Sequence, residues 1–155
     1  MANGTPKYKR VLLKLSGEAL ADKSGKDILD HEMLAKVANV IKTTLEAGVE
    51  VAIIVGAGNI WRGRQGSDMD RVKADHMGML ATTINCIALE DALKRTGVCA
   101  HVMSAVTVES FTERFDRRKA IEAQKKRGSY LRGRARYALR FDRYSGGSTR
   151  GRNRR

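Results

Sequence analysis

The stretch "VAIIVGAGNIWRG", residues 51–63, joins an apolar run to a loop that contains three glycines. A short apolar run that ends at a turn signal is typical of a buried strand in a parallel sheet. Glycine allows close approach of the backbone to a ligand, and successive amides at such a turn can hold phosphate oxygens. Taken alone, the stretch leaves two interpretations open: a tight structural turn or a phosphate-binding loop.

The segments on either side of this stretch predict alternating strands and helices. Strands are expected at residues 11–15, 51–55 and 98–106, and helices at 30–48, 67–97 and 117–126. Asp30 is a candidate N-cap of the first long helix, and Ser67 or Asp68 of the second. The apolar face of the second helix is expected to include Val72, Met79, Leu80, Ile87 and Leu93. This order predicts an α/β fold with a parallel sheet that helices cover on both faces.

In such a sheet, ligands bind beyond the carboxyl ends of the strands, where the turn at Ser16 and Gly17 and the loop at 56–63 both lie. Lys14 interrupts an apolar strand just before this edge. A buried lysine is costly unless it faces a ligand or an acid, whereas an edge strand would leave it in solvent. Asp75 lies on an otherwise apolar helix and could accept hydrogen bonds from a sugar hydroxyl, whereas His76 is expected to be an ordinary helix residue.

Basic charge is concentrated in the last part of the chain. The 155 residues have a formal net charge of +13 and an isoelectric point of about 10.2. Residues 129–155 contain nine Arg and one Asp and so carry +8, while the other 128 residues carry +5. Such basicity generally favours nucleic acid or an acidic membrane as a partner. Here no membrane partner is expected, and nucleic acid is expected only through the tail.

The remaining composition predicts a cytoplasmic protein. Cys86 and Cys99 lie in apolar segments without the spacing of a zinc site, which favours buried thiols in a reducing compartment. The N-terminal "MANGTPKYKR" has no apolar segment after its charges, so no signal peptide is expected. No apolar run approaches the roughly 20 residues that span a bilayer, and no metal site is expected from the spacing of potential ligands.

Four segments together, "YKRVLLKLSGEAL", "GAGNIWRG", "RVKADHMGMLAT" and "MSAV", resemble the bacterial-type uridylate kinases of the amino-acid kinase superfamily. The resemblance covers roughly residues 8–127, in order and at the family's spacing. It implies a three-layer αβα sandwich with a mainly parallel sheet, and transfer of the ATP γ-phosphoryl group to UMP with Mg²⁺, a step of pyrimidine nucleotide biosynthesis. It also implies a homohexamer and allosteric control by GTP and UTP.

The resemblance implies roles for individual residues. The implied ATP-binding residues are Lys14, Leu15, Ser16, Gly17, Gly58 and Arg62. Lys14 and Arg62 are also the implied catalytic residues, because phosphoryl transfer depends on positioning and on electrostatic stabilisation of the transferring group. The implied UMP-binding residues are Ala57, which stands where the family often has a third glycine, and Asp75, which corresponds to an aspartate that holds the ribose.

Beyond residue 127 the sequence departs from the family's pattern of a strand followed by a second glycine loop that grips UMP. Back-translation of residues 129–154 with permitted codons, read one base later, gives "VIFAGGLGTPFVSTDTAAAARAAEI", which resembles that family segment. We therefore expect residues 1–127 to be the N-terminal part of an amino-acid kinase-like domain. Residues 128–155 are expected to be an out-of-frame, disordered tail, and the kinase activity of the chain to be impaired. Sequencing the gene near codons 125–130 tests this expectation.

A rival interpretation gives the tail a function. Its "RGR", "YSGG" and "RGRNRR" segments resemble arginine-glycine sequences that bind RNA through charge and stacking. On this interpretation, the chain is a nucleotide-binding domain with a basic RNA-binding tail and no kinase activity. A third possibility is a catalytically silent nucleotide-binding fold.

Overall fold

The computed structural model describes residues 6–62, 68–106, 108–110, 112–125 and 136–140. Its elements, in chain order, are β1 (Arg10–Leu15), the 3-10 helix η1 (Gly17–Leu20), α1 (His31–Glu46), β2 (Glu50–Val55), α2 (Arg71–Arg95), β3 (Cys99–Ser104), β4 (Glu113–Arg114), α3 (Arg117–Lys125) and β5 (Arg136–Arg140). The alternation of strands and helices predicted from the sequence is confirmed. The boundaries differ by one or two residues, except at the start of α2, which was expected at residue 67 and lies at Arg71.

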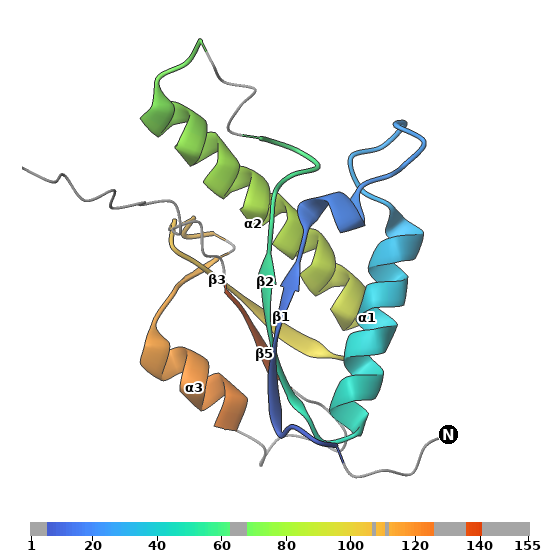
Figure 1. The fold of residues 1–155 in the computed structure, drawn as a ribbon. Helices are drawn as coiled ribbons and strands as arrows, with labels where there is room; N and C mark the ends of the chain where they lie inside the picture. Colours follow the sequence, from blue (N-terminus) through green and yellow to red (C-terminus); the bar gives the residue numbers. More distant parts are fainter. Residues whose placement is uncertain (1–5, 63–67, 107, 111, 126–135, 141–155) are drawn as a thin grey trace, which may run out of the picture.

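The described strands form one sheet in the order β1-β2-β5-β3-β4 (Figure 1). Every described pairing is parallel, and β1 runs beside β2 from Arg10 opposite Glu50 to Leu15 opposite Val55. The carboxyl ends of β1 and β2 therefore reach the same edge of the sheet together. The turn at Gly17 and the loop at Gly56 begin side by side at that edge.

Helices lie on both sides of the sheet (Figure 1). The core lies between the sheet and the pair α1 and α2, whereas α3 lies on the other side. The buried residues of this core are Leu20, Leu34, Ala38, Ile41, Val51, Ile53, Val55, Cys86, Leu89, Leu93, Val98, Ala100 and Val102. This arrangement confirms the expected αβα layering.

The packing face of α2 differs from the expectation. Val72 and Leu80 are 57% and 48% exposed, and Met79 and Ile87 are only half-buried. Of the five residues expected on this face, only Leu93 is fully buried. Besides Leu89 and Leu93, the helix buries a face of small and polar residues: Ala74, Gly78, Ala81, Thr82, Thr83, Asn85 and Cys86. Small side chains bring the helix axis close to its neighbours, so the larger apolar residues turn outward.

Helix ends follow the capping rules. The carboxylate of Asp30 accepts a hydrogen bond from the Met33 N–H at 2.9 Å, as predicted for an N-cap. The N-cap of α2 is Asp70, which accepts from the Lys73 N–H at 3.1 Å, and not Ser67 or Asp68. Asp68 precedes the helix in a turn, and Ser67 lies outside the described residues.

One strand comes from the segment that was expected to be disordered. Residues 136–140 form β5, whose Leu139 pairs with Ile53 of β2 and with Val102 of β3. For these five residues the expectation of disorder differs from the structure, because backbone pairing on both sides places them in the middle of the sheet. The other residues of 128–155 lie outside the described part of the chain.

Within the described residues, α2 is the longest helix, and no helix combines the length and apolar character needed to cross a membrane.

Candidate functional site

The turn after β1 and the loop after β2 are in direct contact. The Gly56 N–H donates to the Leu15 carbonyl with an N···O distance of 2.8 Å. A Cβ on Gly17 would lie 2.5 Å from Asn59 Oδ1 and 2.7 Å from the Gly56 carbonyl oxygen, closer than real contacts allow. Glycine is therefore needed at position 17, because the two backbones meet there without room for a side chain.

Ser16 starts η1 and belongs to the same junction. Its hydroxyl accepts a hydrogen bond from the Glu18 N–H at 3.3 Å, and its carbonyl accepts one from the Ala19 N–H at 3.0 Å. Its extended conformation, with φ −71° and ψ 138°, is typical of an N-cap. The turn formed by Leu15, Ser16 and Gly17 thus leaves the sheet edge and contacts the loop after β2 directly.

Arg62 lies over the β2 loop, where its side chain contacts Gly58 and Glu18. Its Nε donates to the Gly58 carbonyl at 3.1 Å, and its Nη2 lies 2.7 Å from Glu18 Oε1. The side chains of Arg62 and Glu18 are 40% and 57% exposed, so solvent reaches the pair. Glu18 Oε1 also lies 3.1 Å from where a Cβ on Gly58 would stand. The carboxylate therefore occupies the place beside Gly58 and Arg62 that suits an anionic oxygen.

Lys14 is exposed, whereas its place in an apolar strand had suggested a buried position. In the described sheet β1 is an edge strand, and Lys14 is exposed on the face that also carries exposed Leu12. The burial cost that argued for a ligand or an acid beside Lys14 therefore does not arise. The residue remains at the carboxyl end of β1, and its side chain lies on the face away from α1 and α2.

The two residues expected to bind the nucleoside monophosphate lie apart. Ala57 is buried in the β2 loop, where its carbonyl accepts hydrogen bonds from the Ile60 and Trp61 N–H groups, each at 2.9 Å. Asp75 is exposed in the N-terminal third of α2. It precedes Asn85, which contacts the loop, by about 15 Å along the helix axis at 1.5 Å per residue. The structure thus joins Ser16, Gly17, Gly58 and Arg62 at one edge, with Asp75 farther along α2.

Sequence reasoning missed two residues of this junction. Glu18 directly follows the Ser16–Gly17 turn, and its charge beside a predicted anion site was the available signal. Asn85 is fully buried on α2 and donates to the Gly56 carbonyl at 2.7 Å. Asn85 stands between apolar residues in "INCIAL", which was an available signal. Its partner on the β2 loop could not be predicted from the sequence.

Two shifted pKa values describe the surroundings of the junction. Asp22 follows η1, and its pKa is lowered to about 2, first by the Ser24 hydroxyl and then by the backbone N–H groups of Ser24 and Asp27. Desolvation by burial, followed by the charge of Glu90, raises the pKa of the Cys86 thiol far above its usual range. Asp22 therefore stays ionised and organises its loop, whereas Cys86 stays a neutral core side chain.

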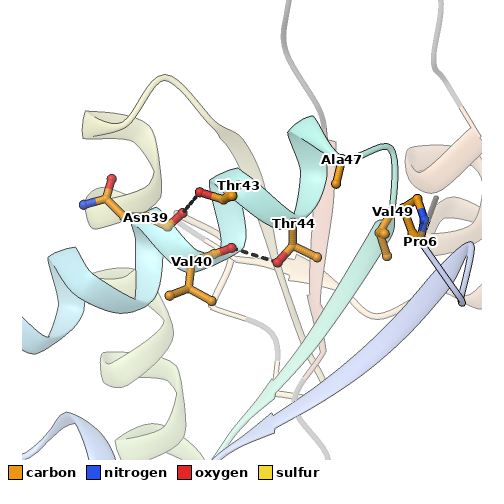
Figure 2. Close-up of a pocket in the computed structure, with 7 residues that line it drawn as sticks. All are labelled: Pro6, Asn39, Val40, Thr43, Thr44, Ala47 and Val49. Carbon is orange, nitrogen blue, oxygen red and sulfur yellow. Dashed lines mark hydrogen bonds between the residues drawn. The ribbon is translucent and has the colours of Figure 1, made fainter. Parts of the chain in front are cut away.

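The described residues contain no group of three or more His, Cys, Asp and Glu side chains that could hold a metal ion. An open hollow of about 570 Å³ lies elsewhere, along the outer side of α1 (Figure 2). Its lining residues are Pro6, Asn39, Val40, Thr43, Thr44, Ala47 and Val49. No lining residue is ionisable, and the Thr43 and Thr44 hydroxyls donate to the Asn39 and Val40 carbonyls. These lining residues therefore provide no charged side chain that could bind a phosphate.

Comparisons with known proteins point to one family. The sequence profile described as "Amino acid kinase family" matches residues 9–132. The UMP kinase from Bacillus anthracis is 36% identical with a TM-score of 0.73, and the match covers 86% of this chain and 52% of that one. The UMP kinase from Ureaplasma parvum is 31% identical with a TM-score of 0.72, and the match covers 86% and 56%.

A more distant match shows the fold alone. The aspartate kinase from Synechocystis is 16% identical with a TM-score of 0.52, and the match covers 84% of this chain and 21% of that one. The chain spans about half the length of the two solved UMP kinases that it matches.

Proposed function

The chain belongs to the amino acid kinase family, and from this premise we propose that it binds ATP and UMP for transfer of the γ-phosphoryl group to UMP. The similarity to two solved UMP kinases supports this substrate pair. The observation that carries the proposal is the junction of the Ser16–Gly17 turn, the Gly56–Gly58 loop and Arg62 at the carboxyl edge of β1 and β2. Ligands of parallel α/β sheets bind at this edge.

On this proposal, ATP phosphates lie on the turn formed by Leu15, Ser16 and Gly17 and reach the loop at Gly58. Arg62 exchanges the Glu18 carboxylate for a phosphate oxygen, which keeps a charge-assisted hydrogen bond in place. Lys14, at the end of β1, supplies a second positive charge to the transferring group. Catalysis then rests on positioning and on charge stabilisation, without a covalent intermediate.

UMP occupies the other side of the loop. The backbone N–H of Ala57 is the proposed donor to UMP, while its carbonyl accepts two hydrogen bonds within the loop. Asp75 holds the ribose through hydroxyl hydrogen bonds at a point farther along α2. The proposed phosphate contact thus lies on the loop after β2, and the proposed sugar contact lies on α2.

Mg²⁺ would enter with ATP. Since the described residues hold no cluster of carboxylates able to bind the ion by themselves, phosphate oxygens and water would be its main ligands. GTP and UTP as effectors, assembly into a hexamer and a cytoplasmic location are further proposals that follow from the similarity to UMP kinases.

The binding part of this proposal is tested by titrating the chain with ATP and Mg²⁺ in a calorimeter. We expect measurable ATP binding, which Arg62→Gln weakens about tenfold because a charge-assisted hydrogen bond is lost. Arg95→Gln is the matched control, since Arg95 forms an exposed ion pair with Asp91 near the end of α2. Unmeasurable ATP binding, or equal effects of the two substitutions, would contradict the proposal.

The catalytic part is tested by a coupled assay of UDP formation from ATP and UMP. We expect little or no UDP from this chain, because residues 128–155 are rich in Arg and Gly where the family carries its second glycine loop. A complete UMP kinase serves as the positive control. UDP formation at the rate of that control would overturn the expected impairment.

The charge of +8 carried by residues 129–155 favours a second candidate function, RNA binding through the tail. Its test is the affinity for single-stranded RNA between 50 mM and 200 mM salt. Backbone charge contacts predict a steep loss of affinity with salt. Deletion of residues 129–155, which removes the whole charge of +8, should abolish most of that binding, and deletion of residues 141–155, which removes +4 of it, should weaken the binding and reduce its salt dependence. An affinity that deletion of residues 129–155 leaves unchanged would eliminate the tail as the RNA site.

A further inference from the structure

A pair of asparagine amides lies beneath the proposed phosphate loop. Asn85 of α2 is 0% exposed. Its Nδ2 donates to Asn59 Oδ1 and to the Gly56 carbonyl, each at 2.7 Å, and its Oδ1 accepts from Asn59 Nδ2 at 3.1 Å. Both donor hydrogens and the carbonyl of the Asn85 amide are therefore used, and its orientation is fixed.

The Asn59 amide connects this pair to the other segments of the junction. Its Nδ2 also donates to the Ile28 carbonyl at 3.2 Å, in the connection that leads to α1. Its Oδ1 is the nearest of the atoms that leave no room for a side chain at Gly17. Helix α2, the β1 turn, the β2 loop and the connection at Ile28 thus meet at one pair of side-chain amides.

The hydrogen bond to Gly56 determines which way the following peptide N–H points. The structure has no cis peptide bond among its described residues, so the Gly56 C=O and the Ala57 N–H are antiparallel across a planar group. Because the Gly56 carbonyl points at Asn85 and hence toward α2, the Ala57 N–H points away from α2. A flipped peptide would instead present a carbonyl oxygen, which repels phosphate.

An apolar residue of similar size at position 85 would also fill the space between α2 and the sheet. It would not bond the Gly56 carbonyl, so packing alone leaves the direction of that peptide unspecified. The hydrogen bonds of Asn85 therefore fix the conformation of the loop and are not needed for the packing of the helix on the sheet.

We propose that Asn59 and Asn85 are positioning residues, which hold the Gly56–Ala57 peptide with its N–H directed toward a bound nucleotide phosphate. This inference rests on the proposed function for the identity of the ligand, and on the hydrogen bonds of Asn59 and Asn85 for the orientation of the loop. It also ties the phosphate loop to α2, the helix that carries Asp75, so both parts of the nucleotide site share one anchor.

The test compares Asn85→Leu and Asn85→Asp with the wild-type chain. Leucine fills the space without donating, and aspartate can only accept when ionised, which favours the flipped peptide. ATP with Mg²⁺, and UMP, are titrated separately against the fluorescence of Trp61, the single tryptophan, whose backbone N–H donates to the Ala57 carbonyl. For each nucleotide that the wild type binds, we expect both variants to bind at least about tenfold more weakly.

Two control variants separate positioning from general stability. Asn39→Asp makes the same chemical change on the exposed side of α1 and should leave binding unchanged. Cys86→Ala removes a buried core side chain next to Asn85 and should lower the urea midpoint while leaving binding within about twofold of the wild type. A loss of binding in Cys86→Ala as large as in Asn85→Leu would overturn the proposal.

A measurement without ligand keeps the inference separate from the proposed function. Acrylamide quenching of Trp61 in the free protein should increase in both Asn85 variants and stay unchanged in both controls, because the loop is released. If the wild type binds neither nucleotide, the proposed function fails while quenching still tests the loop. Unchanged quenching together with unchanged nucleotide affinity in Asn85→Leu would disprove the positioning role.

Discussion

Glu18 Oε1 lies 2.7 Å from Arg62 Nη2 and directly beside Gly58, so a carboxylate of the protein occupies the position proposed for a phosphate oxygen. The pair is solvent-exposed, and exposed ion pairs contribute about 0–1 kcal/mol. Such a weak contact keeps Arg62 over the loop and still allows a ligand with more negative charge to replace Glu18.

The first prediction follows from this competition. Glu18→Gln should bind ATP about two- to fivefold more tightly, because one negative charge and one competing acceptor are removed. The difference should fade in 1 M salt, where screening is strong. Glu32→Gln, which breaks an exposed ion pair with Lys36 on α1, should leave ATP affinity unchanged. Weaker ATP binding by Glu18→Gln would show that Glu18 supports the ligand.

The second prediction concerns the junction at Gly17. Gly17→Ala forces a Cβ against Asn59 and the Gly56 carbonyl and should lower the free energy of unfolding by about 1–3 kcal/mol. It should also weaken ATP binding. Gly25→Ala is the control, since its φ of +74° is unfavourable for alanine but its surroundings are open. Urea unfolding and ATP titration of both variants should show lost stability in both and lost binding only in Gly17→Ala.

The loops after β1 and β2 could be predicted from the sequence only in part. The apolar runs that end at Leu15 and Val55 predicted two strands of a parallel sheet, and the turn at Ser16 and the loop at Gly56 were expected at one edge because parallel strands end together. The structure adds that the two strands are neighbours. The amide contacts of Asn59 with Asn85 and Ile28 could not be predicted, because they depend on how closely α2 packs against the sheet. This close packing follows from the small residues of α2, whereas the sequence analysis expected the large apolar residues to form the packing face.

The third prediction uses the raised pKa of the Cys86 thiol. The unfolded chain's thiol loses its proton near pH 8.5, whereas the buried thiol stays neutral to a higher pH. Stability should therefore be complete below about pH 8.5 and fall as pH rises further, because the unfolded state then binds fewer protons than the native state. Urea unfolding between pH 7 and 10.5 should show a decline that is smaller in Cys86→Ala and unchanged in Cys99→Ala. Equal declines in all three proteins would contradict the assignment to Cys86.

The fourth prediction concerns β5. Truncation after residue 127 removes this strand, whereas truncation after residue 140 keeps it. Since β5 pairs with β2 on one side and β3 on the other, we expect the shorter chain to lose its cooperative unfolding transition. The longer one should unfold cooperatively in urea, with a midpoint close to that of the whole chain. Matching transitions in both truncated chains would show that β2 and β3 hold together without β5.

The strand β5 was also beyond prediction from local sequence. The segment "RYALR" alternates Tyr137 and Leu139 with Arg and Ala, but this signal extends over only five residues, and its neighbours are rich in Arg and Gly. Its place in the sheet depends on two partners far away in the chain, and tertiary pairing of this kind overrides local preference.

The central position of β5 also has a consequence for the order of events during synthesis. The strands β1, β2 and β3 leave the ribosome before the strand that lies between β2 and β3 has been made. Until then the facing edges of β2 and β3 carry open backbone groups that can pair with other chains. The sheet closes only through contacts between residues far apart in sequence, which slows folding. The nascent chain is therefore expected to need protection by a chaperone until Arg140 has emerged.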